Sequence, residues 1–304
     1  MTVLKNQLKT IVLLGVLSAL LLGMGALVAP GHLWVFGTMA LVMNLGAYFF
    51  SERIVLAMHR ASEVGPAEAP TLHAIVDELA LRAGIPKPRV FVIPEEQPNA
   101  FATGRNPKHA VVAVTEGILR ILDRRELRGV LAHELAHIKN RDILIASLAA
   151  AAASLITWIA HALSFGALFG GSHEDSESGS VGQGLLVALV APLAATLVQL
   201  GISRSREYLA DATGAQLSGD ADALASALLK LERASEVVPA SQPTPATASL
   251  FIVNPFGPME TVARWFSTHP STAERVRRLR ALAAAQATRV SSRSRSYRLA
   301  SGRW

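Results

Sequence analysis

The sequence predicts a mainly α-helical protein in which about four membrane-spanning helices are continuous with a polar α+β part that carries a small β-sheet. Of the 304 residues, 51% are hydrophobic and only 17% are charged, whereas soluble domains contain about 25% charged residues. Three long stretches contain no charged residue at all, namely 10–51, 143–173 and 178–203. Between them lie short alternating and amphipathic patterns, which are typical of small strands and surface helices.

The first charge-free stretch has 42 residues, which is enough for two membrane helices of about 20 residues each. Pro30-Gly31-His32 interrupts it, so we expect a helical hairpin over about 11–29 and 33–51. The other two stretches supply one span each, about 143–168 and 181–203. Buried core helices of soluble proteins seldom contain uncharged runs of this length, and the first run is too long for a signal peptide.

Basic residues flank the predicted spans on one side only. They precede the first and third spans and follow the second and fourth: Lys5, Lys9, Arg53, Arg60, Lys139, Arg141, Arg204 and Arg206. The two short loops on the other side, 30–32 and 171–180, contain no Lys or Arg. The positive-inside rule therefore places both termini and the larger polar segments in the cytoplasm. The net charge of +6 then reflects these flanks and five arginines after Thr288, so no nucleic-acid partner is expected.

The first polar segment, 52–142, is predicted to contain one amphipathic helix and a small sheet. The expected elements are a helix over 71–83, strands over 89–93 and 110–114, a third strand within 99–104, and a helix that begins near 123–126. No breaker follows that last helix, so we expect it to continue into the third span.

The second polar segment, 204–287, is predicted to be helical with one flexible loop. The expected elements are helices over 202–217, 220–234 and 271–285, with a loop over 236–248 that is rich in Pro, Ser, Thr and Ala. The basic tail, 288–304, contains many serines and no acidic residue, and we expect it to be disordered.

The most informative motif is His133-Glu134-Leu135-Ala136-His137. On a helix, residues four apart lie on one face, so both imidazoles can bind one metal ion, and the intervening Glu134 can reach a water on that ion. The chain has no cysteine, so any further ligand must be His, Asp or Glu.

Glu207 is the best candidate for a third ligand. It lies four residues after the fourth predicted span, and His137 lies six residues before the third, so both are within about 10 Å of the same membrane interface. Asp211, one helical turn after Glu207, would orient a ligating histidine. His269 and Asp142 remain alternative ligands, and ordinary Arg–Glu pairing on a helix surface is the simplest alternative for Glu207.

Taken together, the motifs resemble those of the HtpX-type membrane zinc metalloproteases, relatives of the CAAX prenyl proteases. The matching pieces, in the family's order, are the hydrophobic hairpin, residues 99–104, residues 133–137, residues 203–211, and residues 267–270 with Arg275. The resemblance implies a zincin-like domain with one Zn²⁺ per chain, bound by His133, His137 and Glu207, and Glu134 as general base. It also implies a cytoplasmic-facing site in a bacterial inner membrane, stress-related quality control of misfolded or damaged membrane proteins, and His269 near the active site.

Two roles follow as hypotheses. His269 would be a second donor to the oxyanion that forms during peptide cleavage. The strand formed by Asn99, Ala100, Phe101, Ala102 and Thr103 would bind an extended polypeptide substrate by adding it to the sheet edge.

Other functions compete with this hypothesis. One is a prenyl-type protease with few substrates, although this chain has few charge-free runs for that many-helix architecture. Another is a zinc-bearing membrane scaffold without activity, which would have no use for Glu134. The sequence makes no prediction about oligomeric state.

Overall fold

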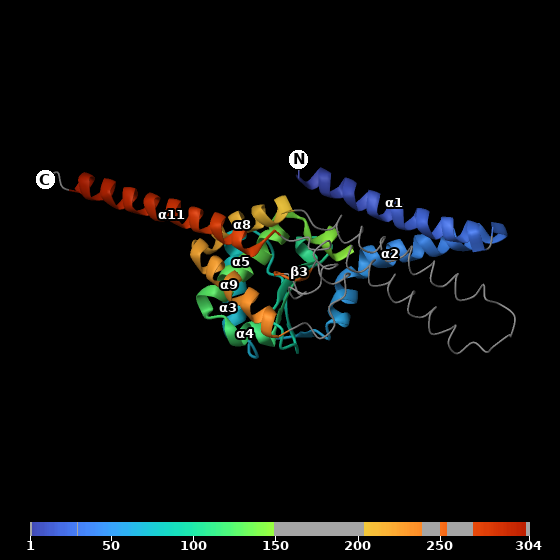
Figure 1. Cartoon of the computed structure of the whole chain (residues 1–304), viewed down its shortest axis with the longest axis horizontal. Helices are drawn as coiled ribbons and strands as arrows, with labels where there is room; N and C mark the ends of the chain where they lie inside the picture. The colour runs from blue at the N-terminus through green and yellow to red at the C-terminus, as the bar shows by residue number, and fades with distance from the viewer. Residues whose placement is uncertain (1, 29, 149–203, 239–249, 254–269, 302–304) are drawn as a thin grey trace.

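The computed structural model describes residues 2–28, 30–148, 204–238, 250–253 and 270–301. A helical hairpin and a compact body lie end to end, and the C-terminal helix projects from the opposite side of the body (Figure 1). The third and fourth predicted spans, about 143–168 and 181–203, lie largely or wholly outside the described residues. So does most of the predicted loop 236–248.

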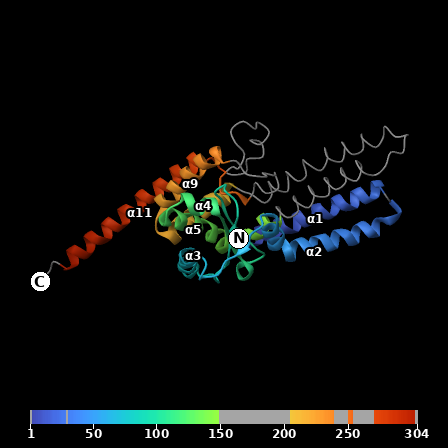
Figure 2. The same cartoon turned by 90° about the horizontal axis from the view of Figure 1, so that it is seen from below.

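The hairpin consists of α1 (Thr2–Val28), a short 3₁₀ turn η1 (Pro30–His32) and α2 (Leu33–Met58). The predicted interruption is confirmed at Pro30–His32, and the two helices run side by side away from the body (Figure 2). Within the described part of the chain, α2 is the one helix long and apolar enough to cross a membrane, and Thr10–Gly23 of α1 forms a shorter apolar helix. Asn44 in α2 links the pair, because its side chain donates to the Leu14 carbonyl and to Ser18 Oγ.

The sheet has four strands in the order β1-β2-β4-β3. Their bounds are β1 (Ser62–Glu63), β2 (Arg89–Ile93), β3 (Ala100–Thr103) and β4 (Val111–Thr115). β2 and β4 pair in parallel, while β1 pairs antiparallel with β2 and β3 antiparallel with β4. β3 therefore forms one edge of the sheet.

Both faces of the sheet are covered. Side chains alternate along each strand, so Val90, Val112 and Val114 join the main core, while Phe91 and Ala113 face the other way. The second face packs against the inner end of α2, where Val55 and Leu56 are buried. The inner end of α2 thus packs against one face of the sheet, and this contact fixes the hairpin to the body.

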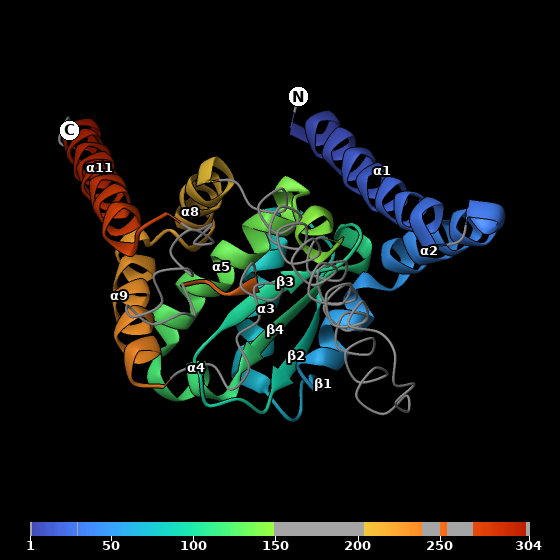
Figure 3. The same ribbon diagram turned by 45° about the vertical axis from the view of Figure 1, so that its right-hand side comes forward.

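Helices form the other layer of the body (Figure 3). Their bounds are α3 (Pro70–Ala83), α4 (Glu116–Ile121), α5 (Arg124–Asn140), α8 (Arg204–Ser218), α9 (Ala221–Val237) and α11 (Thr272–Ser301). α5 is the central helix and contacts α3, α8, α9 and β3. Its Val130, Leu131 and Leu135 are fully buried, and burial of each such side chain contributes about 1.5–3 kcal/mol.

Three expectations differ from the structure. The helix that begins at Arg124 does not continue into the next stretch, because Arg141 adopts a left-handed conformation (φ 58°) and ends it. Glycine or asparagine normally marks such a stop, so an arginine gave no signal. The tail after residue 287, expected to be disordered, continues α11 as a helix to Ser301. The short strand β1 was not predicted, because its two residues carry no alternation.

Candidate metal centre

The motif helix α5 begins with a reciprocal cap. Asp123 accepts from the Glu126 amide at 2.8 Å, and the Glu126 carboxylate accepts from the Asp123 amide at 3.1 Å. This satisfies two amides that would otherwise lack a partner at the helix start. The cap thus fixes the start of a helix whose last turns bear His133 and His137 on one face, as the spacing predicted.

Helix α8 brings the third side chain to this face. It crosses α5 at Gly214, where a Cβ atom would lie only 2.9 Å from the Cα atom of His133. Only glycine allows the two backbones to approach so closely. Glu207, seven residues earlier and two turns along α8, is thereby carried to the histidines.

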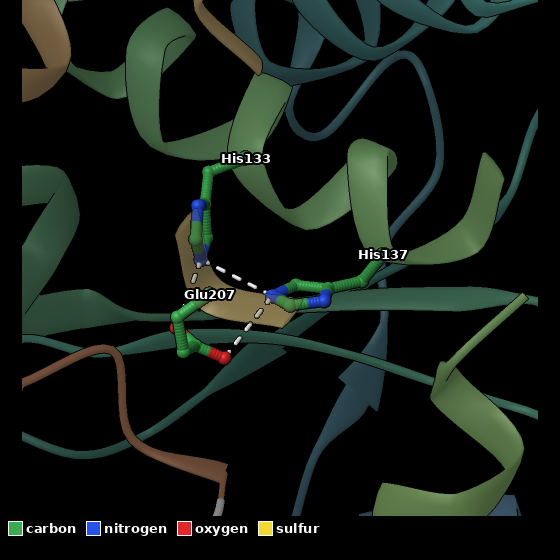
Figure 4. Close-up of side chains that lie close together, drawn as sticks. All are labelled: His133, His137 and Glu207. Carbon is green, nitrogen blue, oxygen red and sulfur yellow. Dashed lines mark hydrogen bonds and ion pairs between the residues drawn. The ribbon is translucent and has the colours of Figure 1, made fainter. Parts of the chain in front are cut away.

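His133, His137 and Glu207 converge (Figure 4). The two Nε2 atoms are 3.2 Å apart, and they lie 3.6 Å and 3.7 Å from the nearer oxygens of Glu207. Ligand atoms about 2.0–2.1 Å from a tetrahedral zinc ion are separated by about 3.3 Å. The three groups therefore fit three corners of a zinc coordination sphere and leave the fourth corner for water or substrate.

Each histidine is oriented through its other nitrogen. His133 Nδ1 lies 3.0 Å from Asp211 Oδ1, and His137 Nδ1 lies 3.2 Å from both carboxylate oxygens of Asp142. A histidine that donates through Nδ1 presents Nε2 as the ligand atom. Asp211 thus faces His133, and Asp142, which the sequence left open as an alternative ligand, contacts Nδ1 of His137.

Arg275 of α11 lies behind these groups. Its guanidinium donates to both oxygens of Asp211, at 2.9 Å from Nε and 2.7 Å from Nη2, and its Nη1 donates to the Ile252 carbonyl at 2.8 Å. The residue is only 1% exposed, and a planar guanidinium is suited to such paired contacts. It connects α11 to the centre through Asp211.

The comparisons agree with this geometry. The profile of peptidase family M48 matches residues 66–283. The chain belongs to peptidase family M48. It is 53% identical over 281 residues to a protein named "Protease HtpX homolog" from Syntrophobacter fumaroxidans, covering 91% of this chain and 99% of that one. A second "Protease HtpX homolog", from Pyrococcus furiosus, is 52% identical over 276 residues, or 90% and 95% of the two chains.

The resemblance to the HtpX type is thereby confirmed. Among solved structures, that of Ste24p from S. mikatae aligns with a TM-score of 0.48 and 22% identity, covering 91% of this chain and 66% of that one.

Negative side chains dominate the electrostatics of this M48 centre. Burial alone would lower the pKa of His137, but Asp142, Glu207 and Glu134 together raise it to about 10. Burial likewise opposes a charge on His133, whereas Asp211 and Glu207 raise its pKa above the usual value. Surroundings that favour positive charge so strongly on two buried imidazoles also favour a cation between them.

Glu134 lies beside the triad and is 5% exposed. Its Oε2 accepts from the Ala102 amide at 2.9 Å. Burial, followed by the neighbouring Glu207, raises the pKa of the Glu134 carboxyl despite the two histidines. A carboxylate with a raised pKa is better matched to accepting a proton near neutral pH than an ordinary one.

The predicted substrate strand lies at the same centre. Ala100, Phe101 and Ala102 line its cavity, and because the Ala102 amide points to Glu134, the outer edge of β3 faces the triad. Thr103 turns to Ser147, with 2.7 Å between the hydroxyl oxygens. Asn99 points elsewhere, since its side chain donates to the Leu250 carbonyl and accepts from the Ile252 amide.

The cavity over the triad has a volume of about 60 Å³, which is room for about two water molecules. One wall of this cavity is formed by Leu250, Phe251 and Ile252. The buried Arg206 also lines the cavity. Burial lowers the pKa of the Arg206 guanidinium below its usual value, although Asp142 and Glu207 act in the other direction.

Sequence reasoning left several of these roles unassigned. Arg275 appeared only as part of a matching pattern, and Gly214 and the wall at 250–252 gave no signal at all. These residues act through contacts with segments more than 20 positions away along the chain. His269, the predicted second donor, lies outside the described residues.

Proposed function

We propose that the chain is an integral-membrane zinc endopeptidase that cleaves misfolded or damaged membrane proteins at the cytoplasmic face of the membrane. The observation that carries this proposal is the convergence of His133, His137 and Glu207 beside the buried Glu134. Three protein ligands with one open position are typical of catalytic rather than structural zinc sites. Membership of a peptidase family supports polypeptides as substrates.

In the proposed mechanism, bound zinc supplies Lewis acidity that lowers the pKa of a water molecule and polarises the peptide carbonyl. Asp211 and Asp142 hold the histidines with Nε2 toward the ion. Glu134 accepts a proton from the attacking water at its carboxylate and passes it to the leaving amine. His269 is proposed as a second donor to the developing oxyanion.

Substrate binding is proposed at the edge of β3. An extended polypeptide that adds to this edge would place a peptide bond beside Glu134, and pairing of this kind uses main-chain groups. Recognition of backbone rather than particular side chains suits a protease that removes damaged proteins of many sequences. Backbone recognition is also expected of a protease with many substrates rather than of a prenyl-type protease with few.

The proposed topology follows the charge-free stretches. The hairpin 10–51 and the region 143–203 would provide two spans each, and the segments 52–142 and 204–287 would form the cytoplasmic catalytic part. Large apolar side chains on the hairpin support membrane placement, since Trp34 is 71% and Ile11 is 66% exposed.

Digestion of casein in detergent tests the activity. The full-length wild type should degrade casein and lose that activity with a zinc chelator, whereas Glu134→Ala should lose at least about a hundredfold in rate. Comparable cleavage by Glu134→Ala would overturn the mechanism. Cleavage of a prenylated peptide but not of casein would favour the narrow-specificity protease, and no chelator-sensitive cleavage of either would favour the scaffold.

A further inference from the structure

The wall segment, residues 250–252, borders the metal cavity but has no role in the mechanism proposed above. It is the short orange segment beside β3 in Figure 3. Its three residues line the cavity together with the metal-binding triad and Glu134, and each of them is at most 5% exposed. A polypeptide that reaches Glu134 therefore lies against the wall segment.

Two side chains hold the backbone of the wall segment. Asn99 binds it at two points, because its side-chain nitrogen donates to the Leu250 carbonyl at 3.2 Å and its side-chain oxygen accepts from the Ile252 amide at 3.1 Å. Arg275 donates to the Ile252 carbonyl at 2.8 Å. Backbone groups on both sides of Phe251 are thus hydrogen-bonded to buried side chains, which fixes the position of that residue.

Asn99 can support the wall segment because it is itself fixed. It is 2% exposed. Its backbone amide donates to Thr115 Oγ1 at 2.9 Å, and its carbonyl accepts from the Thr115 amide at 2.9 Å. Its backbone and its side chain are therefore both bound within the protein. The sequence placed Asn99 in the predicted substrate strand, whereas these contacts make it a support for the wall segment.

The side chains of the wall segment pack in different places. Leu250 belongs to the cluster on one face of the sheet, together with Phe101, and Ile252 belongs to the main core on the other face. Phe251 lies between them and belongs to neither cluster of the described residues, yet it lines the cavity. Its two neighbours hold the segment, and Phe251 is left to contact a substrate.

The cavity beside Phe251 is small, and it is apolar apart from the ionisable groups around the metal centre. Its other lining residues are alanine, isoleucine, leucine and phenylalanine. A polar substrate side chain would lose hydrogen bonds to water against such a lining. The volume of about 60 Å³ has room for a methyl group but not for a large ring. A substrate side chain that enters should therefore be small and apolar.

We propose that Phe251 is a specificity-determining residue, which limits a substrate position beside the cleaved bond to small apolar side chains such as that of alanine. Asn99 is the positioning residue that holds Phe251 against this position. The proposal rests on the peptidase function proposed above and adds one sequence preference to it. Such a protease can still cleave most damaged proteins, because alanine is among the commonest residues.

Peptide binding to an inactive variant tests the proposal without requiring cleavage. Full-length Glu134→Gln, loaded with zinc in detergent, is titrated with two fluorescent peptides that differ only in one central residue, alanine or phenylalanine. The peptides contain no other alanine, glycine or serine, so that no second small residue can take its place. We expect the alanine peptide to bind at least about tenfold more tightly, because the larger side chain does not fit.

Adding Phe251→Ala should bring that ratio to about one or below, because removal of the ring opens the wall. Phe50→Ala is the matched control, since Phe50 is exposed on the hairpin and does not line the cavity. An unchanged ratio in the Phe251→Ala protein, or an equal change in the Phe50→Ala protein, would overturn the proposal.

Asn99→Ala, also in the Glu134→Gln protein, tests the support of the wall segment. It removes two of the three backbone contacts described above and should lower the ratio in the same direction as Phe251→Ala. Asn106→Ala is its control, because the Asn106 side chain also accepts from two backbone amides but does not line the cavity. An unchanged ratio in Asn99→Ala would contradict the positioning role.

Mapping of cleaved bonds separates this proposal from the proposed function. The wild type and Phe251→Ala digest casein in detergent, and mass spectrometry identifies the bonds that are cut. Phe251→Ala should accept leucine and phenylalanine about tenfold more often at one position beside the bond, whereas an equal change at every position would overturn the proposal. If neither protein cleaves but the binding ratio still depends on Phe251, the proposed enzyme is wrong and the role of Phe251 stands.

Circular dichroism melting and zinc content show whether each variant folds. If Phe251→Ala does not fold, Phe251→Leu carries the same test, with a smaller expected change because fewer atoms are removed.

Discussion

Helices α5 and α8 cross at Gly214, and helices α1 and α2 cross at Gly25. In the body, a Cβ atom at Gly214 would lie 2.9 Å from backbone atoms of His133. In the hairpin, a Cβ atom at Gly25 would overlap the side chain of Phe36. Both crossings depend on the absence of a side chain: at Gly214 the obstacle is the backbone of His133, and at Gly25 it is the Cβ, Cγ and Cδ2 atoms of the Phe36 side chain.

The surroundings of the two crossings differ more than the crossings themselves do. Around Gly214, α5 is packed on several sides, and its Val130 and Leu135 are fully buried. Around Gly25 the hairpin keeps large apolar side chains exposed, among them Trp34 at 71% and Val42 at 62%. The body can therefore hold ionisable groups in a fixed arrangement, whereas the exposed apolar surface of the hairpin suits the membrane placement proposed above.

Polar contacts follow the same division. In the body, the buried pair of Arg275 and Asp211 joins α11 to α8 next to the crossing, and in the hairpin the amide of Asn44 joins α2 to α1. Removing one partner of a buried ion pair leaves an uncompensated charge, whereas interhelical hydrogen bonds in membranes contribute only about 0.6 kcal/mol on average. The comparison therefore predicts large effects in the body and small ones in the hairpin.

The largest effect is expected for Arg275→Met, which should destabilise the body by about 3–5 kcal/mol, because Asp211 would remain buried without its guanidinium. Circular dichroism melting in detergent measures it. Arg120→Gln, in an exposed pair with Glu96, is the control and should not shift the melting temperature. Equal shifts in both variants would mean that the buried pair stabilises the body no more than an exposed pair does.

The next effect compares the glycines directly. Gly214→Ala should destabilise the protein by about 1–3 kcal/mol and reduce its zinc content, since α8 must move away from α5. Gly25→Ala should cost less than about 1 kcal/mol and leave zinc unchanged. Alanine raises the helix propensity equally at both positions. A difference in stability between the two variants therefore comes from the helix crossings. Zinc loss in Gly25→Ala would contradict the division between hairpin and body.

Asp142→Asn tests the orientation of His137. The asparagine keeps the size of the side chain but removes its charge, and loss of such an orienting carboxylate weakens metal binding by about 10–100-fold. Competition with a chelator measures the affinity. Asp77→Asn, which removes a carboxylate from an exposed pair with Lys87, is the control and should bind zinc as the wild type does.

The smallest effect concerns the start of α5. Burial raises the pKa of Glu126, but hydrogen bonds from Lys230, Ser226 and the Asp123 amide outweigh it and lower the pKa overall. A lowered pKa stabilises the fold above the ordinary value, near 4.3, and this contribution is lost as the pH falls through the lowered value.

Glu126→Gln should therefore cost about 1 kcal/mol at pH 7, and the difference from the wild type should shrink in acid. Melting curves of both proteins at pH 7 and at progressively lower pH test this. A difference that grows as the pH falls would contradict the assigned direction.

Much of the fold follows from local patterns. The strand over 89–93 and the helix over 71–83 were predicted closely, because their periodicity and their Gly84 stop are written in adjacent residues. The start of the motif helix near 123–126 was likewise predicted, although its end at Asn140 was not. In each case the physical cause lies within a few positions of the residue concerned.

The remainder depends on distant partners. No local signal shows that Arg275 pairs with Asp211, 64 positions away, or that the Asn99 side chain contacts Ile252, 153 positions away. The left-handed Arg141 is similar, because Asp142 closes the turn: its amide donates to the His137 carbonyl, and its carboxylate contacts His137 Nδ1. Asn99 is a further example: the sequence placed it in the predicted substrate strand, and its side chain contacts backbone groups of residues 250 and 252.

The zinc content of three full-length proteins tests the central claim, that the crossing of α5 and α8 builds one metal site from His133, His137 and Glu207. Wild type, Glu207→Ala and Glu134→Ala would be purified in detergent and analysed by plasma mass spectrometry. The account predicts about one zinc per chain in wild type and Glu134→Ala, and little in Glu207→Ala. Full zinc content in Glu207→Ala, or its loss in Glu134→Ala alone, would contradict it.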